Sequence, residues 1–145
     1  MYITLTKRKL FIILSAIIIA FLLITQFLSV KVSGTEISTN AQRVQYITTL
    51  GVDLESDESE QKQVIIPQEF GDVYRNYNAL QQTAGFDLSA FKGKKVTVYT
   101  YHTTDGKAVN LMVYKNKLIG GDISDLSVNG EMISLKGNED GKRTF

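Results

Sequence analysis

Three side chains in the C-terminal third of the chain could support hydrolytic or metal-dependent chemistry: His102, Asp122 and Asp125. His102 is the only imidazole, and an imidazole can act as a general base or as a metal ligand. Two nearby carboxylates can transfer protons or hold a divalent cation. One hypothesis is therefore a cell-envelope hydrolase or metal-dependent enzyme, which requires these three side chains to meet in one cleft.

The surroundings of these residues favour structural roles. No G-x-S-x-G motif marks a nucleophile. His102 falls within an expected β-strand, and Asp125 lies in a serine-containing loop, where aspartate typically caps a turn. Gly120 and Gly121 lack the lysine and helix start of a phosphate loop, so we expect a bulge or a close backbone approach there. The residues thus predict no enzyme, with no catalytic, cofactor-binding or metal-binding residue and no cofactor.

The composition excludes several further classes. Cysteine is absent and histidine occurs once in 145 residues, which excludes disulfides, thiol nucleophiles and multi-histidine metal sites within one chain. Residues 1–34 contain four of the 16 basic residues and no acidic residue, so the remainder is slightly acidic and nucleic acid is not an expected partner. The acidic run between Val52 and Lys62 lacks the spacing of an EF-hand and is interpreted as a solvated connector, and residues 92–95 are interpreted as a solvated basic turn.

An uncharged apolar run over residues 10–30 organises the chain. As a helix its 21 residues would span roughly 30 Å, the thickness of a bilayer's hydrocarbon core. Lys7, Arg8 and Lys9 precede the run and only Lys31 follows it, which favours a cytoplasmic N-terminus and an external C-terminal domain. The residues taken as representative of this predicted membrane anchor are Leu10, Phe11, Ile12, Ile18, Phe21, Leu22, Phe27 and Val30.

A cleaved signal peptide is the alternative interpretation of this run. Signal peptides have the same charged start, but their apolar region is usually about 7–15 residues long. The residues after Val30 also form a poor small-x-small cleavage site. We therefore expect an uncleaved, single-pass signal-anchor in the cell membrane, and a secreted soluble binding domain remains the alternative.

The rest of the chain predicts one α+β domain. Apolar spacing of three and four residues predicts amphipathic helices over residues 41–50 and 68–84, the first opened by a capping box from Thr39 to Gln42. Runs of period two, separated by turn signals such as Asp105-Gly106, predict an antiparallel meander of four to five strands with both helices on one face. The expected strands cover residues 63–66, 96–103, 109–114, 118–123 and 131–135. The expected organisation is a cytoplasmic segment (1–9), the transmembrane helix (10–30), a juxtamembrane linker (31–40), the external domain (41–135) and a flexible tail (136–145).

Two surfaces of this domain are assigned by alternation. The aromatic stripe of the second helix, which includes Tyr74 and Tyr77, is expected to pack in the core. In the strand over residues 96–103, the valine-containing set is expected to face the helices. The opposite sheet face would then be a partner surface formed by Tyr99, Tyr101, Met112 and Tyr114.

Several stretches resemble a bacterial family, the domain of unknown function 4830. They are the IPQEF start, NYNALQ, GFDL, the KGK turn, the YTY strand and LIGGD, together with the helix that ends in RVQYITTLGV, and the likeness covers roughly residues 40–135. The resemblance implies a Firmicute-type bacterial protein whose domain follows one membrane segment. It implies no activity and no site residues. The anchor, the small domain and the lack of a catalytic constellation lead us to expect a domain that binds an unknown membrane or envelope protein. The lipid bilayer is the other expected partner, and the sequence leaves the oligomeric state open.

Overall fold

The computed structural model describes residues 14–15, 17–20, 34–127 and 130–136. The chain divides into two compact units, Met1–Lys31 and Val32–Phe145. In the first unit the described residues, Ile18 among them, are helical and exposed. Within the described residues no helix is long and apolar enough to cross a membrane. The other predicted anchor residues and Lys7, Arg8 and Lys9 lie outside the described residues, as does the predicted tail from residue 137 onward, so the anchor stays a prediction.

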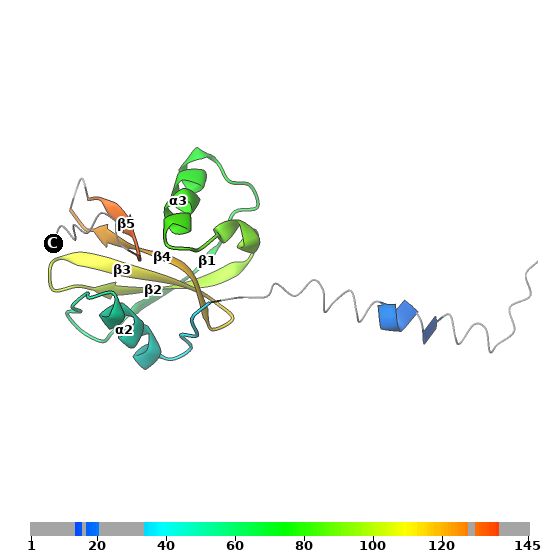
Figure 1. The fold of residues 1–145 in the computed structure, drawn as a ribbon, viewed down its shortest axis with the longest axis horizontal. Helices are drawn as coiled ribbons and strands as arrows, with labels where there is room; N and C mark the ends of the chain where they lie inside the picture. The colour runs from blue at the N-terminus through cyan, green and yellow to red at the C-terminus, as the bar shows by residue number, and fades with distance from the viewer. Residues whose placement is uncertain (1–13, 16, 21–33, 128–129, 137–145) are drawn as a thin grey trace, which may run out of the picture. The chain divides into compact units, whose positions relative to one another are not determined.

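The second unit is built on a five-stranded antiparallel sheet in the order β1-β2-β3-β4-β5 (Figure 1). This arrangement confirms the predicted α+β class and meander. Tight turns join β2 to β3 and β3 to β4. Gly106 in the first turn has φ +78°, and Lys115 and Asn116 in the second have φ +48° and +64°, the left-handed backbone conformations that such turns require. The strands are β1 (Glu60–Ile65), β2 (Lys95–His102), β3 (Lys107–Tyr114), β4 (Lys117–Asp125) and β5 (Met132–Ser134).

The first helix of the domain, α2 (Asn40–Thr49), begins where its capping box predicts. The Gln42 amide N–H donates to the Thr39 hydroxyl, and the Gln42 side chain accepts from the Thr39 amide. Gly51 follows the helix with φ +72°, the left-handed conformation that ends many helices. The helix buries Ile47 and, less expectedly, Arg43.

The second helix, α3 (Asp72–Thr83), is shorter than the predicted 68–84 and is followed by the 3₁₀ helix η1 (Leu88–Phe91). It begins late because Gly71 is its N-cap and the chain before it is still bonded to the sheet. The Ile66 amide donates to the Lys94 carbonyl, and the Gly93 amide donates to the Ile66 carbonyl. These bonds extend the β1–β2 pairing past the end of β1.

The two helices lie on opposite faces of the sheet, as Figure 1 shows, so the prediction of both on one face is wrong. α2 covers the face that carries Tyr101, whose hydroxyl accepts a hydrogen bond from Arg43 Nε at 2.9 Å. α3 covers the face that carries Asp122, whose Oδ2 accepts from the Tyr77 hydroxyl at 2.8 Å. The core cluster on the α2 face consists of Ile37, Ile47, Tyr101, Val109, Leu111, Val113, Leu118 and Leu135.

The predicted linker over residues 31–40 is shorter than expected, because its second half belongs to the domain. Glu36 forms an isolated antiparallel bridge with Lys117 at the start of β4. The Ile37 amide donates to the Asn116 carbonyl, and the Leu118 amide donates to the Thr35 carbonyl. Because Ile37 is fully buried in the core, this segment is fixed to the sheet.

Candidate functional site: a groove between α3 and β5

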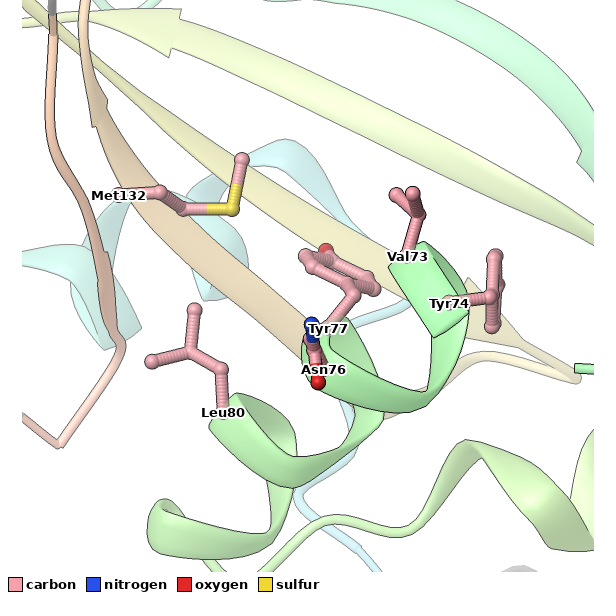
Figure 2. Close-up of a pocket in the computed structure, with 6 residues that line it drawn as sticks. All are labelled: Val73, Tyr74, Asn76, Tyr77, Leu80 and Met132. Carbon is pink, nitrogen blue, oxygen red and sulfur yellow. The ribbon is translucent and has the colours of Figure 1, made fainter. Parts of the chain in front are cut away.

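An apolar groove opens between α3 and the last strand of the described sheet (Figure 2). Its volume is about 410 Å³. In Figure 2, Met132 of β5 faces Tyr77 and Leu80 of α3, with Val73 at one end. Val73 is 85% exposed and Met132 is 45% exposed. The groove therefore presents apolar side chains to solvent, and its lining residues are Val73, Tyr74, Asn76, Tyr77, Leu80 and Met132.

The groove exists because α3 turns polar residues, and not its aromatic stripe, toward the sheet. Its two buried residues are Asn78 and Gln81. Asn78 Oδ1 accepts from the Leu88 amide at 2.8 Å, and Gln81 Oε1 accepts from the Gly121 amide at 2.8 Å. The prediction that the whole stripe packs in the core is therefore wrong: Tyr77 is half-buried and Val73 is exposed.

The close approach of Gln81 explains Gly120, and the close approach of the Asn110 backbone explains Gly121. A β-carbon at Gly120 would lie 3.0 Å from Gln81 Oε1, and one at Gly121 would collide with the Asn110 carbonyl. The ladder between β3 and β4 shifts register at Met112 and Val113, beside these glycines. The predicted bulge and close backbone approach are confirmed. Gln81 Nε2 is buried with no hydrogen-bond partner among the described residues.

Beneath the groove a polar network joins α3 to the middle of the sheet. Asp122 is only 3% exposed and accepts hydrogen bonds from Tyr77, from Asn110 Nδ2 at 2.9 Å and from the Ser124 hydroxyl at 2.5 Å. The Thr100 hydroxyl donates to Asn110 Oδ1 at 2.7 Å. Burial, together with the adjacent Asp122 carboxyl group, raises the pKa of Tyr77 well above its ordinary value of 10.0, so the phenol remains a donor at physiological pH.

The three residues of the enzyme hypothesis do not form one site. Asp122 is buried in the network, whereas Asp125 Oδ1 accepts from the Ser127 amide at 2.8 Å. This bond lowers the pKa of Asp125 and confirms the turn-capping role. His102 is exposed at the end of β2, with Nε2 3.6 Å from Glu60 Oε1. In the described part of the chain, no group of three or more His, Cys, Asp or Glu residues could hold a metal ion.

The predicted partner surface is divided between the two sheet faces. Tyr101 is fully buried under α2, and Arg43 stacks on the Tyr99 ring at 3.8 Å. Met112 is buried on the opposite face, since alternate residues of a strand point in opposite directions. Tyr114 packs edge-on against Phe91 of η1, with ring centroids 5.6 Å apart. These four residues therefore offer no shared exposed surface.

Comparisons with protein-family models, with curated proteins and with solved structures give no match for this chain. The likeness to the domain of unknown function 4830 therefore stays a prediction. The groove residues Asn76 and Met132 were not singled out from the sequence. The signal that could have found the groove is the spacing of Asn78 and Gln81, which lie three residues apart on one face of α3 and mark the side that meets polar sheet groups.

Proposed function

We propose that residues 34–136 form a non-catalytic binding domain of a single-pass bacterial membrane protein, placed outside the cytoplasm by the apolar run over residues 10–30. Its receiving site is the groove between α3 and β5, and its partner is an envelope or membrane protein that inserts apolar side chains there. The observation that carries this proposal is the exposure of Val73 and Met132 on either side of one groove. Exposed apolar patches of this kind typically mark interaction sites.

The arrangement of the polar groups supports binding over catalysis. Each oxygen of Asp122 already accepts a hydrogen bond from within the domain, and the side chain has almost no access to solvent. A general base must reach the proton that it removes, directly or through one water. The only imidazole in the sequence lies on an exposed strand end beside Glu60, and within the described residues no hydrogen bond links this imidazole to the Asp122 network.

The shape and chemistry of the groove narrow the class of partner. Its walls are apolar, so they favour aliphatic or aromatic side chains over charged ones. A volume of about 410 Å³ is at the lower end of the range for ligand pockets, which suits one or two side chains of a protein segment. Asn76 in the lining supplies an amide that can donate to or accept from a backbone group of that segment.

The test is a crosslinking pull-down of the full chain from its own membranes, comparing the variants Val73→Asp and Ile65→Asp. Both side chains are exposed, at 85% and 65%, but Ile65 lies on β1, away from the groove. Val73 is the second residue of α3, where a carboxylate is compatible with the helix dipole, so the fold should tolerate the change. We expect Val73→Asp to lose a partner that Ile65→Asp keeps. If both variants capture the same partner equally, the groove is not the binding site.

Protease treatment of intact cells tests the topology on its own, because an external domain is digested and a cytoplasmic one is protected. The intact mass of the mature protein separates the anchor from the cleaved signal peptide, since cleavage would remove about the first 34 residues.

A further inference from the structure

Two lysine-rich turns that are separate in the sequence meet at one end of the sheet. The first precedes β2, which starts at Lys95, and the second joins β3 to β4, which starts at Lys117. Thr97 pairs with Val113 and Tyr114 pairs with Lys117, so both turns lie at the same end of neighbouring strands. The lysines brought together in this way, the basic end of the domain, are Lys92, Lys94, Lys95, Lys115 and Lys117.

These lysines are available to an outside partner. All are exposed except Lys117, which is half-buried. Among the residues that the structure describes, none of the five forms an ion pair. Lys92 Nζ lies 4.7 Å from the centre of the Phe70 ring, which holds this ammonium group beside an aromatic surface. Glu36, Glu69, Asp72 and Asp87 are the acidic residues of the adjoining segments. Because Asp72 pairs with Arg75, positive charge prevails at this end.

The other end of the sheet carries the opposite charge. Asp105 lies in the turn between β2 and β3, and the acidic connector is attached beside it, because the Thr104 amide donates to the Asp53 carbonyl. Asp125 closes β4 at the same end. The further acidic residues in the segments that join here are Glu55, Asp57, Glu58, Glu60 and Glu131. Lys107, which pairs with Asp105, is a basic residue at this end, and the acidic residues outnumber it. The domain therefore carries opposite charge at its two ends, although its net charge is small.

The chain enters the domain at the basic end. Ile37 is hydrogen-bonded to Asn116, which lies inside the second lysine-rich turn. Thr35 is hydrogen-bonded to Leu118, which follows that turn. Val30, where the apolar run ends, and Thr35 are five residues apart, and at 3.3–3.6 Å per residue this segment reaches no farther than about 18 Å. On the anchor of the proposed function, so short a segment would keep Thr35 near the bilayer surface.

We infer that the basic end docks on anionic lipid headgroups of the membrane that anchors the chain, with the acidic end directed away from it. The inference rests on the anchor in the proposed function. Lysines at a negatively charged bilayer surface are attracted to it, and like charge at the far end opposes the inverted orientation. Docking would fix the direction in which the domain presents its groove, because β4 runs from the docked end to the acidic end.

The test uses the full chain in vesicles of phosphatidylcholine alone and of phosphatidylcholine mixed with phosphatidylglycerol. An amine-acylating reagent is applied, and the labelling rate of each lysine is measured by mass spectrometry, with Lys62 on β1 as the internal reference. We expect the five lysines to react more slowly in the anionic vesicles, and we expect this protection to fade at high salt, where surface charge is screened.

Paired variants sharpen the measurement. Each lysine at the surface favours the docked state by about fivefold, so Lys94→Gln with Lys115→Gln should lower the ratio of docked to undocked protein about 25-fold. The control, Lys107→Gln, keeps the Lys62 reference, removes positive charge at the opposite end of the sheet and should leave the protection of Lys92, Lys95 and Lys117 unchanged.

The outcomes separate the two proposals. Equal labelling in both lipids, with the chain retained in the vesicles, would overturn docking and leave the anchor standing. A chain that alkaline carbonate strips from the vesicles would overturn the anchor and docking together, while the Val73→Asp comparison would still report on the groove.

Discussion

The hydroxyl of Tyr77 donates a 2.8 Å hydrogen bond to Asp122, and this bond ties the floor of the groove to the middle of the sheet. The ring of Tyr77 lines the groove, while its oxygen belongs to the buried network beneath. Tyr77 therefore contributes both to the apolar groove and to the polar contact that positions α3. The roles of its ring and its hydroxyl can be tested separately by mutation.

Tyr77→Phe should destabilise the domain without changing the groove. The substitution removes a donor to the buried Asp122 carboxyl group, and hydrogen bonds to such groups contribute about 1–3 kcal/mol. Chemical denaturation of the full chain in detergent, followed by circular dichroism, measures the loss. Tyr74→Phe is the control, since no hydrogen bond to the Tyr74 hydroxyl occurs among the described residues, and it should change stability by less than about 0.5 kcal/mol. An equal loss in both variants would contradict the role of the Asp122 bond.

The domain should lose stability at alkaline pH, in part through Tyr77. The pKa of Tyr77 is raised in the folded state, so its contribution is complete below the unfolded value of 10.0 and declines as the pH rises above it. One such group lowers the free energy of unfolding by up to about 1.4 kcal/mol for each pH unit. Burial raises the pKa values of Tyr46 and Tyr74 as well, so the decline is shared. Denaturation midpoints recorded across this range should fall less steeply for Tyr77→Phe than for the native chain.

Arg43→Met should release the first segment of the domain. Arg43 is buried and donates to the Tyr101 hydroxyl and to the carbonyls of Ile37 and Ser38. Methionine fills part of the space but makes none of these bonds, and we expect a loss of about 1–3 kcal/mol. Hydrogen exchange should accelerate at the Ile37 and Leu118 amides before the rest of the sheet.

The control for this change is Arg75→Met. Arg75 pairs with Asp72 on the surface of α3, where ion pairs contribute about 0–1 kcal/mol. Unchanged exchange at Ile37 in Arg43→Met, or an equal effect of Arg75→Met, would show that Arg43 does not hold this segment.

Gly121→Ala should disrupt the packing of β4 against β3 and Leu135. The added methyl group would collide with the Asn110 carbonyl and with Leu135, and overpacking of this kind costs about 1–3 kcal/mol. Gly71→Ser offers a comparison, because Gly71 is an N-cap without a side-chain bond and has open space around it. Serine there should add a few tenths of a kcal/mol. Thermal unfolding of both variants measures these changes, and a neutral Gly121→Ala would refute the close packing.

Local sequence signals predict the helices, strands and turns, but they do not predict which face of the sheet each helix covers. The capping box at Thr39, the Asp105-Gly106 turn and the alternation of the strands depend on neighbouring residues only, and each is found where it was expected. Which face of β2 meets a helix depends on contacts far along the chain. From the sequence, Tyr101 is assigned to the open face because the valine-containing set is expected to face the helices, yet Arg43 and Asn40 satisfy its hydroxyl in the core.

The candidate site was hidden from the sequence for the same reason. Periodicity assigns apolar residues to the core, so it places the aromatic stripe of α3 inside and its amides outside. Asn78 and Gln81 reverse this order, because the buried amides of Leu88 and Gly121 need acceptors and the side-chain oxygens of Asn78 and Gln81 supply them. Asp122 was noticed as a candidate catalyst, whereas its three donors make it a structural acceptor.

The attachment of residues 35–37 to the start of β4 also has a mechanical consequence. Any force applied through the N-terminal segment reaches the sheet first at the Thr35–Leu118 and Ile37–Asn116 hydrogen bonds and at the Arg43 side chain. If a bound partner were pulled away from the N-terminal segment, the hydrogen bonds at this junction would carry the force before the ladder between β3 and β4 did. A pulling experiment should therefore show an early, small extension as the segment peels away, followed by the rupture of the sheet.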